Sequence, residues 1–110
     1  MTGTPGPIPQ GTLDLLVLRT LAAGPSHGYA IARFIEGATD DALRVEEGSL
    51  YPALYRMQRR GWIAAERGRS ELGKDIKTYR LTAAGRTELR RRTAQWGHLI
   101  DAVEKVFRST

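Results

Sequence analysis

Apolar side chains follow one another along the chain at spacings that change from helical to strand-like and back. In residues 13–23 they leave little polar face, and Gly24-Pro25 follows at once. This segment predicts a mostly buried helix that Thr12 caps and the Gly-Pro pair ends. A second helix is predicted from a Ser26 cap to Gly37, because its apolar residues recur at helical spacing.

A third helix is indicated before Gly61, which supplies its stop. Because proline fits best in the first turn of a helix, Pro52 places the start at residues 47–49. The apolar stripe of this helix consists of Leu50, Leu54 and Met57. The opposite stripe presents Ser49, Pro52, Ala53, Arg56 and Arg60, with Tyr51, Tyr55 and Arg59 on its flanks.

Two parts of the chain favour strands. The weak alternation in residues 40–46 predicts a short strand between the second and third helices. After Gly61 the period changes, and residues 62–67 and 76–81 predict a β-hairpin whose long polar tip spans residues 68–75.

Thr82 is expected to cap a last helix of about 25 residues. Its apolar residues recur seven apart, and no further element of the chain is left to cover them. The simplest partner is a second copy of the chain, so a homodimer is predicted. The predicted dimerisation residues are Leu89, Trp96, Leu99, Ile100, Val103 and Phe107.

The predicted order is helix, helix, short strand, helix and two-stranded hairpin, which is the layout of a winged helix-turn-helix. The fold class is therefore mainly α with a small β-hairpin, followed by a long C-terminal dimerisation helix. We expect three parts: a flexible N-terminal arm at 1–11, rich in glycine and proline, a winged-helix DNA-binding domain at 12–82, and the dimerisation helix at 83–110.

Charge is unevenly distributed over the 110 residues, which carry a net charge of +5. Residues 56–92 hold twelve bases and four acids, a net +8, whereas the remainder carries −3. The positive field therefore lies on the third helix, the hairpin and the start of the last helix, which points to a phosphate-rich partner. A solvated, unevenly charged surface is the alternative interpretation.

Several function classes are excluded or disfavoured by composition. The chain has no cysteine, which excludes disulfides, thiolate metal sites and thiol nucleophiles. Arg19 interrupts the best apolar run, and residues 1–11 lack the features of a signal peptide, so we expect a cytoplasmic protein without a membrane segment. His27 is interpreted as a polar residue at a turn, and neither it nor His98 belongs to a metal or triad motif; no cofactor and no catalysis are expected.

Double-stranded DNA is the partner that fits this layout, with the third helix in the major groove and the hairpin beside it. Ser49 and Tyr51 could instead cap the helix and pack inward, respectively, and Arg90, Arg91 and Arg92 are read as the solvated face of the last helix. The candidate DNA-binding residues are Ser49, Tyr51, Pro52, Tyr55, Arg56, Arg59, Arg60, Lys74 and Lys77. Among these, Arg59 and Arg60 are equally well explained as solvated charges.

Several sequence blocks together resemble the PadR family of bacterial transcriptional regulators, over about residues 11–107. They are Gly11-Thr12-Leu13-Asp14-Leu15-Leu16, His27-Gly28-Tyr29, Glu46-Glu47-Gly48-Ser49-Leu50-Tyr51-Pro52-Ala53-Leu54, Gly61-Trp62-Ile63 and Tyr79-Arg80-Leu81-Thr82-Ala83-Ala84-Gly85-Arg86. The short length resembles the subgroup with a single C-terminal dimerisation helix.

The resemblance implies a homodimeric winged-helix repressor that binds a palindromic operator and is relieved by a small aromatic or cationic effector. Trp96 either packs between the two copies or stacks on such an effector. The wing is less basic than in similar members, because Glu71, Asp75 and Thr78 interrupt its bases, so its contact with DNA stays open. A winged-helix module that binds an acidic protein is the alternative function.

Overall fold

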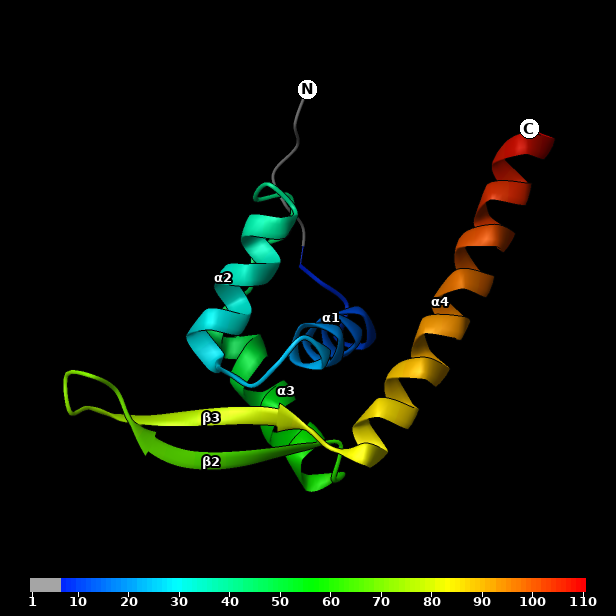
Figure 1. Cartoon of the computed structure of the whole chain (residues 1–110). Helices are drawn as coiled ribbons and strands as arrows, with labels where there is room; N and C mark the ends of the chain where they lie inside the picture. Colours follow the sequence, from blue (N-terminus) through cyan, green and yellow to red (C-terminus); the bar gives the residue numbers. More distant parts are fainter. Residues whose placement is uncertain (1–6) are drawn as a thin grey trace.

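The computed structural model describes residues 7–110. Its elements follow in the order α1 (Gln10–Ala22), β1 (Ser26–His27), α2 (Gly28–Ala38), α3 (Glu47–Arg59), β2 (Ile63–Arg69), β3 (Asp75–Leu81) and α4 (Ala83–Ser109). Figure 1 shows the first three helices gathered into one body, from which the β2–β3 hairpin and α4 project in different directions. The predicted arm falls largely on residues 1–6, which lie outside the described residues.

The sheet is antiparallel with strand order β1-β3-β2. In the hairpin Ile63 pairs with Leu81 at the base and Arg69 with Asp75 at the tip, which makes the predicted wing. Gly73 has a φ of +76° in the tip, where a residue without Cβ turns the chain at no steric cost. The hairpin and the predicted mainly helical fold are confirmed. The predicted tip at residues 68–75 is too long, because the strands stay paired as far as Arg69 and Asp75 and leave only residues 70–74 in the turn.

One apolar core holds the three helices of the body and the base of the hairpin together. α1, α2, α3 and the base of the hairpin bury leucine, isoleucine and methionine side chains against one another, which supplies the main driving force for folding. The largest fully buried side chains are those of Leu18, Leu21, Ile31, Leu50, Leu54, Met57, Ile63 and Val17.

Both predicted N-caps of the first two helices are wrong. α1 begins at Gln10, because the Pro9 carbonyl already accepts a hydrogen bond from the Leu13 N–H (2.9 Å), and Thr12 lies inside the first turn. α2 is capped by His27, whose Nδ1 accepts from the Ala30 N–H at 3.2 Å, while Ser26 belongs to β1. The interpretation of His27 as a polar residue hydrogen-bonded at a turn is confirmed.

The predicted strand at residues 40–46 is also wrong. Asp40 and Asp41 have φ values of 50° and 61°, and this left-handed pair ends α2 in a turn instead of extending it. The third strand is β1, two residues long, where Ser26 pairs with Tyr79 and His27 with Thr78. A strand of two residues is too short to show an alternation of apolar and polar side chains. It is recognised only by its pairing with β3.

α3 starts at Glu47, as predicted, but Pro52 lies in its second turn and not in its first. Pro52 has no N–H to donate to the carbonyl of Gly48, and because Gly48 is exposed, water can replace that hydrogen bond. Ala53, predicted on the outer stripe, is only 2% exposed, since it packs in the core beside Leu54. The outer face of α3 is therefore narrower than predicted.

α4 is capped by Thr82, whose Oγ1 accepts from the Gly85 N–H at 3.0 Å, as predicted. Its first turns pack on α1, and Leu89 is buried in the chain's own core at 8% exposure. Leu89 therefore has a partner within the chain, and the prediction that the whole apolar stripe lacks one is wrong for this residue. The C-terminal part of the helix projects from the body (Figure 1). Its exposed large apolar residues are Trp96, Leu99, Val103, Val106 and Phe107.

Candidate nucleic-acid interface

The outer face of α3 carries hydroxyl groups and arginines. Ser49 does not cap the helix, because the N-cap residue is Glu46, so the capping alternative does not hold and the Ser49 hydroxyl lies on the exposed face. Tyr51 is 45% and Tyr55 63% exposed. The exposed members of the predicted set on this helix are Ser49, Tyr51, Pro52, Tyr55, Arg59 and Arg60.

Two arginines near the end of α3 lie over aromatic rings. The Arg59 guanidinium is 5.8 Å from the centre of the Tyr55 ring, and that of Arg60 is 5.4 Å from the Trp62 ring. Such contacts favour one side-chain orientation without neutralising the charge. An open cleft lined by Tyr55, Arg56, Arg59 and Arg60 results, a positive concave surface suited to a phosphate group.

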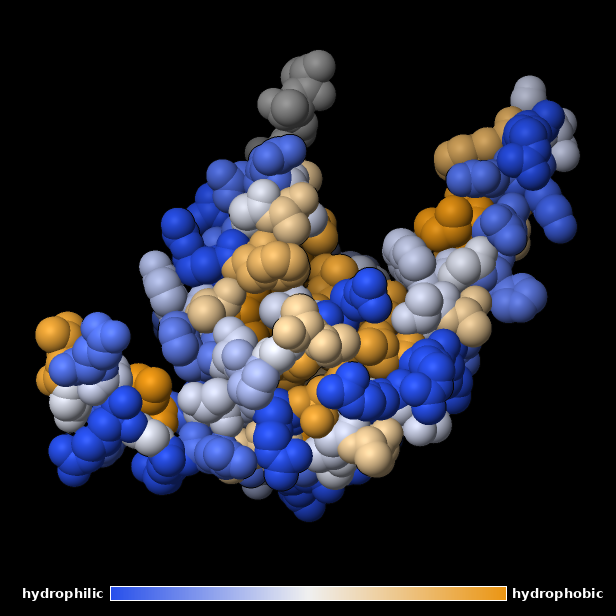
Figure 2. Space-filling model, viewed as in Figure 1, coloured by the Kyte–Doolittle hydropathy of each residue, from blue (hydrophilic) through white to orange (hydrophobic). Residues whose placement is uncertain are grey.

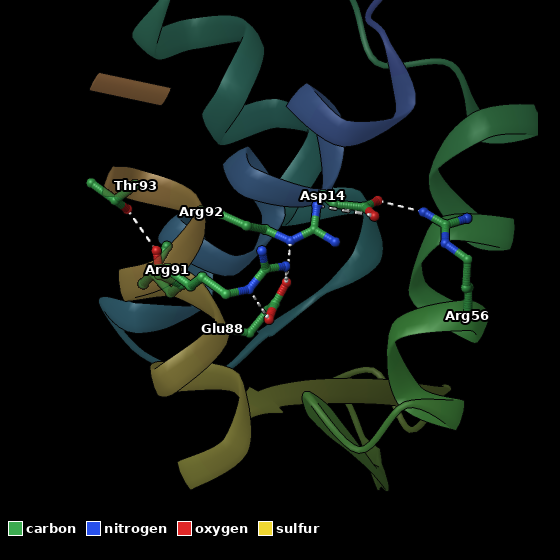
Figure 3. Close-up of polar contacts among 7 residues, drawn as sticks. Asp14, Arg56, Glu88, Arg91, Arg92 and Thr93 are labelled. Atoms are coloured by element: carbon green, nitrogen blue, oxygen red, sulfur yellow. Dashed lines mark hydrogen bonds and ion pairs between the residues drawn. The ribbon is translucent and has the colours of Figure 1, made fainter. Parts of the chain in front are cut away.

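Arg56 lies differently from its neighbours. Its Nη2 is 2.5 Å from Oδ1 of Asp14 on α1, and its side chain is 29% exposed. The guanidinium that the sequence placed opposite DNA bases is thus paired with a carboxylate of the protein's own α1 (Figure 3).

A second cleft lies where α2, α3 and the wing meet. Tyr51 stands in it beside Tyr79 and is only partly exposed, so it packs inward in part, as the alternative interpretation proposed. Burial, and to a smaller degree the neighbouring Tyr51, raise the pKa of Tyr79 above its ordinary value. The cleft is lined by His27, Gly28, Tyr29, Tyr51, Asp75, Ile76, Lys77 and Tyr79.

The wing presents its two lysines at different depths. Lys77 lies over the Tyr79 ring at 5.7 Å, near the second cleft, whereas Lys74 lies in the turn at the tip. Leu72 in the same turn is 84% exposed, an apolar residue among polar ones that the sequence analysis did not single out. Figure 2 shows hydrophilic residues along most of the wing with hydrophobic ones towards its tip.

The arginines at the start of α4 only partly follow the prediction that they are solvated. Arg90 is exposed, but Arg91 and Arg92 both donate to Glu88, with Nη2 of Arg91 at 2.5 Å and Nε of Arg92 at 2.6 Å from Oε2. The hydrogen bond from Arg91 leads the causes that lower the pKa of Glu88. Arg92 is only 20% exposed, because its side chain extends from α4 towards the body and lies over the Trp62 ring.

The projecting half of α4 exposes an apolar face. Trp96 is 42% exposed and Phe107 73%, and Val106, which the predicted set omitted, is 61% exposed. Figure 2 shows hydrophobic residues on the side of this helix that faces the body. Between the helix and the start of α1 runs an open groove of about 260 Å³, lined by Pro9, Gly11, Thr12, Leu15, Arg92, Gln95, Trp96 and Leu99.

Other chemistries receive no support from the residues that the structure describes. Within 7–110, no group of three or more histidine or acidic side chains is placed to hold a metal ion. In the same range, the helices are either too short or too polar to cross a bilayer.

Asp14 is the residue of this region that sequence reasoning missed. It lies within an apolar run, where its side chain is only 4% exposed. An isolated carboxylate in such a run must find a cationic partner, because burying it alone is costly. A single aspartate in an apolar run therefore indicates a buried ion pair. The sequence does not indicate which of the many arginines is its partner.

Comparison with known proteins gives matches over most of the chain. The family model described as "Transcriptional regulator PadR-like family" matches residues 17–91. A PadR family transcriptional regulator from Eggerthella lenta is 35% identical, with 92% of this chain and 86% of that chain covered at a TM-score of 0.78. A transcriptional regulator from Clostridium thermocellum is 29% identical, covering 87% and 93% at 0.81. A PadR-like transcriptional regulator from Bacillus cereus is 28% identical, covering 89% and 93% at 0.76.

Proposed function

Because the chain belongs to the PadR-like family of transcriptional regulators, we propose that it is a homodimeric repressor that releases a palindromic operator when a small aromatic or cationic molecule binds. The family consists of non-enzymatic regulators that bind DNA, and the chain is accordingly a DNA-binding regulator and not an enzyme. Beyond DNA binding, we propose the symmetry of the operator, the dimer, the repression and the effector.

The observation that carries the proposal is the joint exposure of the outer face of α3 and the wing. A helix of about 10–12 Å diameter fits a major groove about 12 Å wide, and the wing then lies along the flanking backbone. In this arrangement the hydroxyls of Ser49, Tyr51 and Tyr55, together with Pro52, meet the groove edge. Arg59, Arg60, Lys74 and Lys77 neutralise phosphates. Arg56 belongs to the same helix, although its guanidinium lies on Asp14.

Dimerisation is supported by the exposed apolar face of α4. Five large residues are uncovered within one chain: Trp96, Leu99, Val103, Val106 and Phe107. Ile100 lies between them and is half-buried. An exposed face of this size on a helix of 27 residues is best covered by the same helix of a second copy. Two copies then present two α3 helices to two half-sites about one helical turn apart.

Trp96 supports the proposed effector site. It lines the groove between α1 and α4, and at about 260 Å³ this groove is smaller than the roughly 300–1,000 Å³ of most ligand pockets. A second copy against the same face would close the groove and enlarge the apolar lining. A planar aromatic molecule can then stack on the Trp96 indole.

A fluorescence anisotropy titration tests the proposal, with DNA from upstream of the chain's own gene and random DNA of equal length. We expect a marked preference for the upstream DNA and a steep loss of affinity with salt, because several phosphates are neutralised. The double variant Arg59→Ala/Arg60→Ala should weaken binding about ten-fold or more and reduce the salt slope by roughly two. Arg19→Ala, which removes an exposed charge from α1, is the matched control and should bind as the wild type does. Equal affinity for both DNAs, with a stable acidic protein partner instead, would favour a protein-interaction module.

A further inference from the structure

Within residues 7–110 two charged side chains are buried, Asp14 on α1 and Glu88 on α4. Both belong to one continuous set of ion pairs that runs from α3 through α1 to α4 (Figure 3). The three helices that must keep a fixed arrangement for DNA binding therefore meet at a single polar cluster.

Asp14 is the centre of that cluster. Its Oδ1 accepts from Nη2 of Arg56 on α3 at 2.5 Å, and its Oδ2 lies 3.6 Å from Nη1 of Arg92 on α4. α1 packs against both of the other helices. One carboxylate thus has one oxygen turned to the proposed recognition helix and the other to the proposed dimerisation helix.

Arg92 is itself fixed by two further contacts. Its Nε donates to Glu88 Oε2 at 2.6 Å, and its guanidinium lies 5.0 Å from the centre of the Trp62 ring. Trp62 follows the end of α3 by three residues, and its N–H donates to the Met57 carbonyl at 3.0 Å. The end of α3 is therefore tied to α4 by a second route.

Stability alone does not explain an aspartate at position 14. Its neighbours in α1 are leucines and valine, and replacing a buried ion pair by well-packed apolar residues is often neutral or stabilising. What an ion pair supplies, and an apolar contact does not, is a fixed direction between the groups that it joins.

We propose that Asp14 is a positioning residue, which sets the orientation of α3 relative to α4 and thereby the distance between the two α3 helices of the dimer. This inference rests on the proposed function. Arg56 contributes to operator binding through Asp14 and not by reading a base. Loss of the Asp14–Arg56 pair leaves the DNA-facing side chains of α3 in place. The distance between the two α3 helices of the dimer then becomes less fixed.

The test is a double-mutant cycle of Asp14→Asn and Arg56→Met, with Arg59→Met as the matched arginine one turn along α3. Affinities are measured on the operator, on operators with one base pair added or removed between half-sites, and on operators with single base changes. Circular dichroism and light scattering establish that each variant is folded and dimeric.

We expect both single variants to weaken operator binding about ten-fold and the double variant to be no weaker than either one, because they break the same contact. Their base preferences within a half-site should match those of the wild type, whereas their penalty for altered spacing should shrink. Arg59→Met should combine additively with Asp14→Asn and leave the spacing penalty unchanged.

Direct base reading by Arg56 predicts the opposite pattern. Arg56→Met would then lose its preference at one base pair per half-site with an unchanged spacing penalty, and Asp14→Asn, which releases the arginine, would bind at least as well as the wild type. That result overturns the inference. If Asp14→Asn does not fold, the two readouts on Arg56→Met decide alone, since that side chain is partly exposed. A wild type without sequence preference overturns the proposed function itself and this inference with it.

Discussion

The ring of Tyr51 on α3 lies directly against Gly28, the first residue of α2. A Cβ placed on Gly28 would come within 2.9 Å of the ring carbon Cε1 and of the hydroxyl oxygen. The glycine therefore leaves the space in which the Tyr51 ring sits, and it fixes where the Tyr51 hydroxyl points. This contact joins α2 and α3 at the edge of the wing cleft.

Gly28→Ala should consequently separate stability from DNA binding. The atoms it meets are the far end of a side chain that is 45% exposed, so the ring can swing away and the free energy of unfolding should fall by less than about 1 kcal/mol. Operator affinity should fall several-fold, because the hydroxyl is displaced. Urea denaturation and anisotropy titration check the two parts. In a Tyr51→Ala background the glycine substitution should have no further effect on affinity, and a further loss there would contradict this explanation.

Gly85→Ala is expected to act on the backbone instead. A Cβ at this position would collide with the carbonyl oxygen of Trp62 and come within 2.7 Å of Leu81 Cδ1. Since a backbone carbonyl cannot swing aside, α4 must separate from the hairpin, at a cost of about 3 kcal/mol. Thermal denaturation measures the loss.

Gly97→Ala supplies the comparison within the same helix. A Cβ at Gly97 meets nothing within 4 Å, and alanine favours the helix over glycine by roughly 0.5–1 kcal/mol. This variant should be at least as stable as the wild type. Equal losses at both glycines would mean that α4 does not sit against Trp62 as described.

The pattern of apolar residues was sufficient to predict the helices, the hairpin and the Thr82 cap, because each depends on residues close together in the sequence. Some errors are local, because Pro9 and His27 precede α1 and α2 in place of the predicted caps and Asp40-Asp41 turn the chain in place of the predicted strand. The other errors lie where distant residues decide the structure. β1 exists through pairing with β3, and Leu89 is covered by the body. Ala53 is buried in the core, although a small apolar residue can equally lie on an exposed helical face.

The contact between Asp14 and Arg56 marks the same limit in the candidate site. The two residues are 42 positions apart, and the sequence presents Arg56 as one of several arginines on an outer helical face. Its long side chain reaches back from that face to the buried carboxylate. Helical periodicity gives the direction of the Cα–Cβ bond, but not the end point of a flexible cation.

The stability of the protein should respond to acid through Glu88. Its pKa is lowered in the folded state, chiefly by the Arg91 hydrogen bond, so its stabilising effect is full above the ordinary value of 4.5 and is lost as the pH falls through the lowered pKa. The wild type should be more stable than Glu88→Gln at pH 7, and this advantage should shrink below pH 4.5. Urea denaturation of both proteins across this pH range measures the difference.

Glu104→Gln is the control for that measurement. Glu104 pairs with Arg108, but both side chains are more than half exposed, and such pairs contribute about 0–1 kcal/mol. Little pH-dependent difference from the wild type is expected. If Glu88→Gln also behaves in this way, the Glu88 cluster does not stabilise the fold.

Val103 offers the sharpest test of the proposed dimer. It lies at the middle of the exposed apolar face of α4 and is 38% exposed within one chain. Val103→Glu would bury a carboxylate without a partner between two helices, which is costly enough to dissociate the dimer. Light scattering at micromolar concentration should then give a monomer, with unchanged helicity because the body does not depend on this residue.

Operator binding should be lost together with the dimer, since one half-site engaged by one chain forfeits the gain in effective concentration that linking two sites provides. His98→Glu introduces the same carboxylate into the same helix, at an exposed position roughly opposite to Val103 around the helix axis. That variant should remain dimeric and bind the operator. A monomer from both variants would place the interface elsewhere on α4. A monomeric wild type that still binds one operator with full affinity would remove the dimer from the proposed function altogether.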